Sequence, residues 1–361
     1  MSHEFFETEM RHAFPSSWVL VADQADVANV GDYVTTTVGN EPVLIVRDGS
    51  GCINGFANVC SHRGTTLATG VGNCEGRFEC PYHGWTFDPD GALQSIPGRK
   101  GFNGQLAGEE LNLRALKLGI WERSIFVNID ESAPDLHSYL GAVPDLLINH
   151  GLTDLLPQIS FDNVVNINWK LLVDNALDDY HLPVVHAETL QPSIEGMKLK
   201  ENIDNPYSSI LCMPLNDSGR GEYVSKMGLG LEQSSSTYAI DIFPNLTVIA
   251  LPNGNISTFQ FNPIDVSTTL VKFRSYSHGL AEGNLEEEEK FISKVLNEDY
   301  RIINRVKEGL KSRYFEPGPA HYLEGRVANF HSTLLNLLGE YCDLPELLSS
   351  DFCSDRSKLA K

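Results

Sequence analysis

Residues 58–91 decide the fold of this chain, opening with NVCSHRG and closing with CPYHGWTFDPDG. Each of these motifs pairs a cysteine with a histidine in turn-rich sequence: Cys60 with His62, and Cys80 with His83. A gap of 17 residues separates His62 from Cys80. Each pair has the spacing to present two ligands from one tight loop, and two facing loops can enclose a metal. The residue types therefore indicate a metal centre in this part of the chain.

Two metals compete for this set of two cysteines and two histidines. Zinc takes such a set tetrahedrally, but zinc fingers use Cys-x2–4-Cys and His-x3–5-His pairs. A Rieske [2Fe–2S] cluster instead holds one iron by two thiolates and the other iron by two imidazoles. Each loop here offers one cysteine and one histidine, as segregated ligands require. The remaining alternative is four unrelated core residues, a coincidence that two matched turns disfavour.

A second set of metal-binding residue types lies in residues 168–186, NWKLLVDNALDDYHLPVVH. We expect a helix that places Asp178 and His181, at positions i and i+3, on one face. Pro183 is expected to break that helix, and His186 follows five residues after His181. Iron(II) that activates oxygen typically binds two histidines and one carboxylate on one face, leaving other positions open. The alternative is a pair of ordinary buried histidines.

Helical periodicity points to the remaining carboxylate. Residues 285–312 read as a helix whose four glutamates, at 286–289, suit a helix N-terminus. Asp299 falls within the apolar stripe of this helix, whereas Glu298 lies mostly off it. A carboxylate aimed into a core must be paired or bound to a metal, so Asp299 is the candidate and a buried salt bridge the alternative. The stripe consists of Ile292, Val295, Leu296, Ile302, Ile303, Val306 and Leu310.

The first motif pair resembles the Rieske motif of the Rieske non-haem iron oxygenases. The resemblance implies that Cys60 and Cys80 hold the inner iron of a [2Fe–2S] cluster, and that His62 and His83 hold the outer iron. Imidazole ligands raise the potential of such a cluster relative to all-thiolate clusters, so it can receive electrons from a reductase.

Residues 168–186 also resemble this family, through its Asp/Glu-x-Tyr-His-x4-His signature, and NEDYRIINRVKEGLKS resembles the segment that carries its iron-bound aspartate. The likeness assigns His181, His186 and Asp299 to a mononuclear iron(II). It implies a different role for Asp178. In the family, the matching carboxylate bridges an iron ligand to a Rieske histidine of the neighbouring subunit.

That bridge would join His181 to His83 of another copy of the chain, making Asp178 the electron conduit of the catalytic site. As an acceptor for both rings, Asp178 would also fix their tautomers. Asp179 adds a second carboxylate beside it. The helix phase favours Asp178, because residue 179 sits about 100° further round the helix.

The resemblance covers nearly the whole chain and implies an α+β protein. We expect a lead-in over 1–39 that packs on the catalytic domain, a small all-β Rieske domain over 40–135, and a mononuclear iron catalytic domain over 136–361. The catalytic domain should contain an antiparallel sheet covered by helices. Short β-type runs bounded by turn residues support this division. They are 42–48, 77–80 and 124–130, then 207–214, 237–250 and 256–275.

Composition disfavours several classes of partner. The chain has 48 acidic and 27 basic residues, and its net charge of −21 disfavours nucleic acid and anionic membranes. No stretch approaches the roughly 18 apolar residues that span a bilayer, and no apolar signal sequence is evident, so we expect a cytoplasmic protein. The seven cysteines are too sparse for a disulfide scaffold, and Cys52 and Cys74 are expected to be buried free thiols.

Together the two centres imply the terminal component of an oxygenase. Such an enzyme uses O2 and electrons relayed by the Rieske cluster to hydroxylate, dihydroxylate or oxidatively demethylate a small organic substrate. The electrons should come from NAD(P)H through a separate flavin reductase or ferredoxin, because no GxGxxG fingerprint follows a strand in this chain. Family architecture implies a head-to-tail homotrimer.

Two other classes stay open at this point: a Rieske-type electron carrier without its own oxygenase activity, and a zinc-structured binding protein. A basic patch for an acidic electron carrier is also conceivable, with solvated surface charge as the alternative. Its members would be Arg63, Arg77, Arg99 and Lys100.

Length bears on the substrate class. The chain is shorter than typical aromatic-ring dioxygenase α subunits and looks more like compact subunits, including those that act on quaternary ammonium compounds. All four tryptophans precede residue 170, so a cation–π cage would need Tyr or Phe. His331 is interpreted as a satisfied core histidine, with pocket lining as the alternative. The aromatic candidates are Tyr207, Tyr223, Tyr238, Phe243, Phe259 and Phe261.

Overall fold

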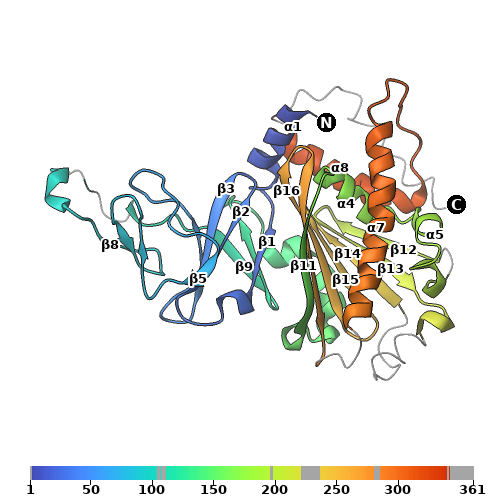
Figure 1. Cartoon of the computed structure of the whole chain (residues 1–361), viewed down its shortest axis with the longest axis horizontal. Helices are drawn as coiled ribbons and strands as arrows, with labels where there is room; N and C mark the ends of the chain where they lie inside the picture. The colour runs from blue at the N-terminus through green and yellow to red at the C-terminus, as the bar shows by residue number, and fades with distance from the viewer. Residues whose placement is uncertain are drawn as a thin grey trace. The chain divides into compact units, whose positions relative to one another are not determined.

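The computed structural model divides the chain into two compact units, Glu7–Ser138 and Tyr139–Lys361, the second of which also includes Met1–Phe6 (Figure 1). The structure describes residues 2–103, 106, 111–195, 198–220, 236–279, 285–339 and 341.

The first unit is built from three small antiparallel sheets. One sheet has the order β1-β10-β9, comprising Val19–Asp23, Ser124–Asn128 and Lys117–Trp121. The second has the order β4-β3-β2-β5, comprising Ile53–Ala57, Glu41–Arg47, Asp32–Val38 and Val71–Asn73. The third has the order β6-β7-β8, comprising Phe78–Glu79, Thr86–Phe87 and Leu93–Ser95. Residues 7–39 of the expected lead-in thus supply strands to this unit, because β1 pairs with β10 and β2 pairs with β3.

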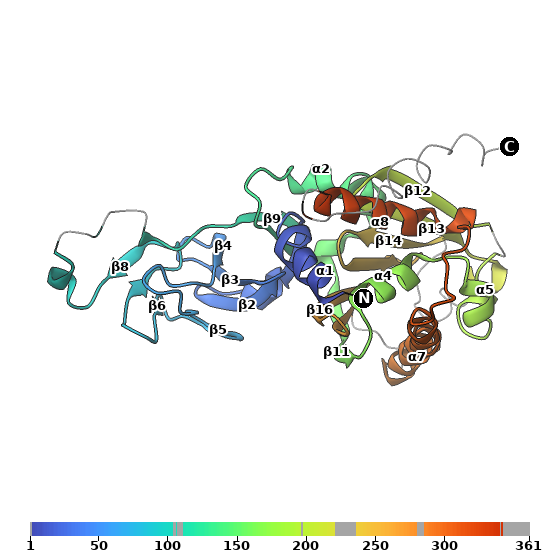
Figure 2. The ribbon, with the colours of Figure 1, turned by 90° about the horizontal axis from the view of Figure 1, so that it is seen from above.

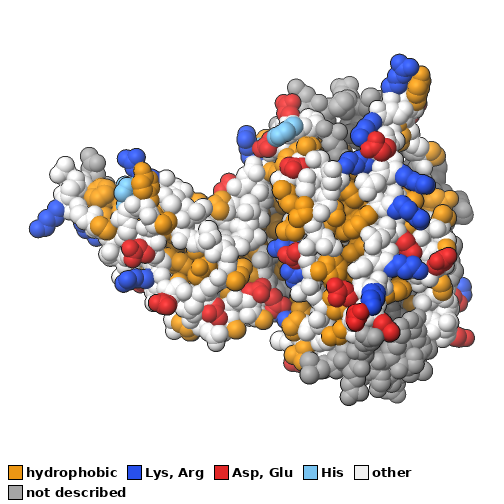
Figure 3. All heavy atoms as spheres, viewed as in Figure 1, with side chains coloured by type: hydrophobic (Ala, Val, Ile, Leu, Met, Phe, Trp, Pro, Cys, Tyr) orange, Lys and Arg blue, Asp and Glu red, His pale blue; other side chains and the backbone are white. Residues whose placement is uncertain are grey.

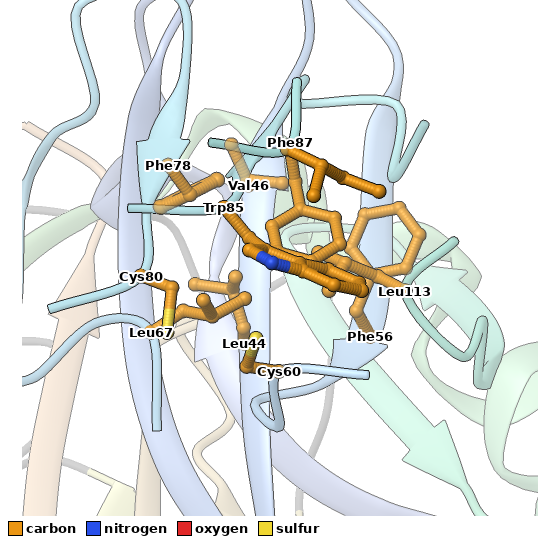
Figure 4. Close-up of a cluster of buried hydrophobic side chains, with 11 residues drawn as sticks. Leu44, Val46, Phe56, Cys60, Leu67, Phe78, Cys80, Trp85, Phe87 and Leu113 are labelled. Carbon is orange, nitrogen blue, oxygen red and sulfur yellow. The ribbon is translucent and has the colours of Figure 1, made fainter. Parts of the chain in front are cut away.

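One hydrophobic cluster supports the cysteine–histidine loops of this unit (Figure 4). Both cysteines, Cys60 and Cys80, are themselves members of the cluster. Strand β3 is buried on both faces over residues 43–46, as its run of branched apolar residues requires. The members are Leu44, Val46, Phe56, Cys60, Leu67, Phe78, Cys80, Trp85, Phe87, Ile96 and Leu113.

The second unit contains a seven-stranded antiparallel sheet with the order β11-β17-β16-β15-β14-β13-β12. Strand β17 alternates between buried and partly exposed residues along its whole length, the period-two pattern of a strand with one buried face. The expected α+β fold class, with an all-β Rieske region and a sheet with helices, is confirmed. The strands are β11 Leu156–Val165, β12 Lys200–Asn205, β13 Ser208–Pro214, β14 Ser236–Ile242, β15 Leu246–Ala250, β16 Ile256–Asp265 and β17 Thr268–Ser277.

Three helices lie against this sheet: α4 (Trp169–Leu177) contacts β16, α7 (Leu285–Gly309) contacts β11, and α8 (Gly325–Leu338) contacts β12 (Figures 1 and 2). Shorter helices are α2 (Leu136–Leu140), α3 (Val143–Leu147) and α5 (Leu182–Val185). None of the described helices combines the length and the apolar character needed to cross a membrane.

The helix predicted to continue through His181 is shorter than expected. Helix α4 begins after Asn168, whose side chain accepts the Lys170 N–H at 3.0 Å, and it ends at Leu177. Asp178 has an extended backbone with ψ 109°, so Asp178 and His181 do not share a helix face. Pro183 lies in the first turn of α5 and starts a helix, because proline lacks the N–H that is unused there.

The close contact of Gly91 with Phe56 generates a stability prediction. A Cβ at Gly91 would lie 2.5 Å from the buried Phe56 ring, and the backbone there has φ +88°. Gly76 has φ +87° and nothing within 4 Å of its Cβ position, so Gly76→Ala is a matched control for backbone strain alone. Overpacking should lower the free energy of unfolding of Gly91→Ala by about 1–3 kcal/mol relative to Gly76→Ala. The measured effect is a lower midpoint temperature of thermal unfolding, followed by the loss of cluster absorbance. Equal midpoints would contradict this packing argument.

Candidate metal centres

The two cysteine–histidine loops have the same backbone design. In the first loop, the Cys60 N–H donates to the Thr65 carbonyl at 2.8 Å, and the Gly64 N–H donates back to the Cys60 carbonyl at 2.9 Å. The second loop repeats both bonds, from Cys80 to Trp85 at 2.8 Å and from Gly84 to Cys80 at 2.9 Å. Both glycines have positive φ, +76° and +70°, which a residue with a side chain rarely adopts. The glycine four residues after each cysteine therefore closes each turn.

These loops bring the two predicted imidazole ligands together and, separately, the two thiols. The ring centroids of His62 and His83 lie 4.6 Å apart, and His62 stacks on Trp85 at 4.7 Å. Cys60 and Cys80 are buried, whereas His83 is exposed and His62 is partly exposed. The cysteines thus lie inside and the histidines outside. This separation fits a cluster with one iron on sulfur and one on nitrogen better than a tetrahedral zinc site.

Backbone N–H groups favour thiolates at both cysteines. Burial raises the pKa of Cys60, although hydrogen bonds from the His62 and Arg63 backbones oppose that rise. Burial acts in the same direction on Cys80, but the Tyr82 and His83 backbones outweigh it and lower the pKa of that thiol. The residues two and three positions after each cysteine therefore offer N–H groups that suit an anionic sulfur.

The second centre gathers His181, His186 and Asp299, with one ligand atom from each residue within 4.8 Å of the others. His181 and His186 cap the two ends of α5, and Asp299 lies on α7. Asp299 Oδ1 is 3.0 Å from His186 Nε2 and 3.6 Å from His181 Nε2. Asp299 Oδ1 and His181 Nε2 are buried without a hydrogen bond, as expected for atoms that face a common metal. The chain has the mononuclear iron site that these residues predict.

The charges around this site favour an ionised carboxylate. Burial alone would raise the pKa of Asp299, but contacts with His181 and His186 lower it to about 2. Burial would likewise lower the pKa of His181, yet Asp178 and Asp299 raise it to about 9. Asp299 is therefore ionised at neutral pH and available to a cation.

Each imidazole also has a carboxylate beside its other ring nitrogen. Asp178 Oδ2 lies 3.5 Å from His181 Nδ1, and Glu298 Oε2 lies 2.9 Å from His186 Nδ1. Thr189 donates its hydroxyl to the same Glu298 oxygen at 2.7 Å. The Glu298 contact is a hydrogen bond, which fixes the tautomer of His186 and leaves its Nε2 for the metal, whereas Asp178 lies at ion-pair distance from a His181 Nδ1 that makes no hydrogen bond. Sequence reasoning missed Glu298 because it lies off the apolar stripe; its position next to Asp299 was the available signal.

The two adjacent aspartates point to different partners. Asp178 lies by His181, whereas Asp179 is buried and lies 3.3 Å from Arg326 of α8. Burial raises the pKa of Asp179 to about 7, against the opposing effect of Arg326. The helix-phase argument for Asp178 does not apply, since α4 ends at Leu177, but the contact with His181 favours the same residue.

Other singled-out residues lie outside the two centres. His331 is partly exposed, and its Nε2 lies 2.8 Å from Asp174. Cys52 is exposed, so the expectation of a buried thiol is wrong there; it lies just before β4, in a turn held by Asp48. Cys74 is partly buried, and burial raises the pKa of its thiol. Cys342 and Cys353 lie outside the described residues.

Comparisons with known families match both units. Residues 17–112 match the Rieske [2Fe-2S] domain. Residues 152–340 match the family described as ring hydroxylating alpha subunit (catalytic domain). Both expected cofactors, the Rieske cluster and the mononuclear iron, agree with these matches.

Individual relatives include enzymes with different substrates. The large oxygenase component of the naphthalene 1,2-dioxygenase system of Pseudomonas fluorescens is 29% identical, covering 80% of this chain and 71% of the relative. The carnitine monooxygenase oxygenase subunit of Escherichia coli K12 is 26% identical, covering 91% and 89%. A crystal structure of a quaternary ammonium Rieske monooxygenase with L-carnitine shares the fold, with a TM-score of 0.77, 23% identity and coverage of 93% of both chains.

The Glu298 contact generates a prediction about iron affinity. Glu298→Gln keeps the size of the side chain but removes the charge that orients His186, so Fe(II) affinity should fall about 10–100-fold. Equilibrium dialysis of the apoprotein against Fe(II) measures the effect. Glu289→Gln, at an exposed position of the same helix, is the matched control and should bind iron normally. Unchanged affinity in Glu298→Gln would exclude this orienting role.

The triad itself generates a second prediction. Asp299→Ala removes a ligand and should lose the mononuclear iron while keeping the colour of the Rieske cluster.

Proposed function

This chain belongs to the ring hydroxylating alpha subunit family of Rieske non-haem iron oxygenases, and from that premise we propose that it oxidises a small quaternary ammonium compound as a monooxygenase. It is the terminal oxygenase component, with a Rieske region and an iron triad in one chain. The electron-carrier alternative has no support, because a carrier does not need His181, His186 and Asp299 at one point.

The extent of the sequence alignments supports this substrate class. The alignment with the carnitine monooxygenase subunit spans nearly all of both chains, whereas a larger part of the naphthalene 1,2-dioxygenase component finds no counterpart here. The solved structures do not separate the two classes, because the L-carnitine complex superposes over 93% of both chains and a naphthalene 1,2-dioxygenase over 92% of this chain and 90% of its own. The two kinds of relative also differ little in identity, so the end-to-end sequence alignment is the observation that carries the proposal.

Phe259 is the aromatic side chain that best suits a cationic substrate. It pairs across the sheet with Thr247 and, on the other side, with Phe273, whose ring lies 4.9 Å away. Residues paired across neighbouring strands lie on the same face of the sheet, and this series of pairs continues from Thr247 through Asp241 to Ser209. Ser209 contacts Arg326 of α8, so Phe259 lies on the face of the sheet that is turned toward that helix. Phe259 is partly exposed and could offer its ring to a trimethylammonium group.

The other aromatic candidates have less suitable surroundings. Tyr207 stacks on Tyr139 with ring centroids 4.3 Å apart, and Phe243 packs against Phe330 at 5.5 Å. Tyr238 is in register with Cys212 and points to the opposite face of the sheet. Phe261 is buried, and Tyr223 lies outside the described residues.

We further propose the ligand assignments that the loops support: Cys60 and Cys80 for the inner iron, His62 and His83 for the outer iron. When bound, the cluster supplies electrons and the mononuclear iron activates O2. The chain's own residues hold these groups, orient the imidazole rings and determine which ring nitrogen of each imidazole carries a proton.

Asp178 is proposed to bridge His181 to His83 of a neighbouring copy in a head-to-tail homotrimer. Exposed apolar side chains follow Asp178 in the sequence: Tyr180 is 53% exposed and Val184, on α5, is 82% exposed. Tyr82, beside His83, is 61% exposed. Apolar surface at both ends of the proposed bridge is consistent with a contact between copies.

The redox partner is proposed to be a flavin reductase or ferredoxin that draws on NAD(P)H. Four basic residues of the first unit are exposed, and Lys and Arg side chains are visible around β8 in Figure 3. On a chain with a net charge of −21, such a patch would orient an acidic carrier toward the Rieske unit. The four residues are Arg63, Arg77, Arg99 and Lys100.

A substrate comparison tests the proposed function. With a reductase and NADH, carnitine, γ-butyrobetaine or glycine betaine should stimulate O2 uptake coupled to product, and naphthalene should not. A matched control is the neutral isostere in which a tert-butyl group replaces trimethylammonium. Loss of the cation–π attraction should weaken its use by about 2–30-fold in kcat/KM. Equal use of the isostere, or oxidation of naphthalene alone, would reject the quaternary ammonium class.

A second test concerns the bridge. Supplied with enough Fe(II) to fill the mononuclear site, Asp178→Asn should keep both metal centres loaded but reduce product formation in a single turnover by roughly tenfold or more, because the neutral amide no longer serves as an acceptor for both imidazoles. Rapid-quench analysis of the pre-reduced protein gives the yield. Asp154→Asn, at an exposed position of the same unit, should react as the unmodified chain does. A normal yield from Asp178→Asn would mean that electrons take another route.

A further inference from the structure

Arg326 is a fully buried cation that joins three separate elements of the catalytic unit. Its side chain is 0% exposed, and it projects from α8. Nη1 lies 3.3 and 3.4 Å from the two carboxylate oxygens of Asp179, in the loop between α4 and α5. Nε donates to the hydroxyl of Ser209 on β13 at 3.2 Å. Asp241 on β14 is also buried, which raises the pKa of its carboxyl, and the same guanidinium opposes that rise.

This arrangement is costly to disrupt. A buried guanidinium is tolerated only when carboxylates and hydrogen bonds compensate for its lost hydration. Removing one partner leaves an uncompensated charge, so the guanidinium and Asp179 hold each other in place. The planar fork of arginine fixes direction as well as distance, which a lysine ammonium does not. The loop after α4 is therefore tied to α8 and, through Ser209, to the sheet.

The tied loop is the one that presents Asp178 and His181. Helix α4 ends at Leu177, and Asp178 accepts the Tyr180 N–H at 2.8 Å in a tight local turn. Asp178 and Asp179 are consecutive but serve different partners, His181 and Arg326. Holding one of two adjacent carboxylates limits the directions open to the other. We propose that Arg326 is a positioning residue that acts through Asp179 to fix Asp178 and His181 at the iron site.

The other histidine ligand has separate support. His186 is oriented by Glu298, which Thr189 holds in turn, and neither residue contacts Arg326 among the described interactions. Loosening Arg326 should therefore disturb one ligand while the His186 and Asp299 side of the site persists. The inference rests on the iron site and not on the proposed substrate class, so the two can fail independently.

The test compares four variants by their mononuclear iron, without any substrate. Arg326→Gln and Asp179→Asn each remove one charge of the pair, and both should weaken Fe(II) binding about tenfold. They should also add a second species to the EPR spectrum of the nitric oxide adduct of the iron. Arg326→Lys, which keeps the charge but not the fork, should show an intermediate spectrum. Asp241→Asn is the matched control, because it removes the other carboxylate near Arg326 without touching the loop.

The control separates positioning from general stability. Asp241→Asn should lower the unfolding temperature while retaining the unmodified EPR spectrum and iron affinity. If Arg326→Gln fails to fold, Asp179→Asn decides the question, since Asn is nearly isosteric with Asp. Unmodified spectra and affinities in Arg326→Gln or Asp179→Asn would overturn the proposal. The same changes in Asp241→Asn as in Asp179→Asn would also overturn it, by showing that core stability alone matters.

Discussion

Two carboxylates occupy the Nδ1 sides of the two iron-site imidazoles, and the rest of the catalytic unit depends on this constraint. Asp178 serves His181 and Glu298 serves His186, so that both Nε2 atoms turn toward Asp299. The hydrogen bond to Glu298 fixes the tautomer and ring plane that His186 presents to a metal, and Asp178 attracts His181 at ion-pair distance. The early end of α4, the single turn of α5 and the length of α7 are what deliver these side chains to one point.

The charged groups of the iron site depend on one another. Three carboxylates surround two imidazoles, and a divalent cation nearly balances that excess of negative charge. The low pKa of Asp299, about 2 despite burial, shows how strongly the histidines compensate the carboxylate. Arg326 balances a further buried carboxylate close by, at Asp179. The catalytic unit thus keeps several titratable groups inside by giving each a partner elsewhere in the chain.

Local patterns were predictable from the sequence, whereas tertiary partners were not. The Cys60–His62 and Cys80–His83 pairs lie within single turns, and Asp299 follows from the period of one long helix, so each signal is contained in a short segment. The helix expected through Asp178 and His181 was wrong, because capping and Pro183 favour two helices with a turn between them. Glu298 and Arg326 act across elements far apart in sequence, which periodicity cannot pair. Cys52 was misjudged because residue type alone says little about one turn at the surface.

Helix α5 has only four residues, with His181 before it and His186 after it. The length of one helical turn therefore sets the distance between the two histidine ligands. Inserting or deleting a residue there would rotate one imidazole by about 100° and remove it from the centre. The length of this segment is therefore fixed by the metal centre, and substitutions are tolerated best at side chains that point to solvent, such as Val184, which is 82% exposed.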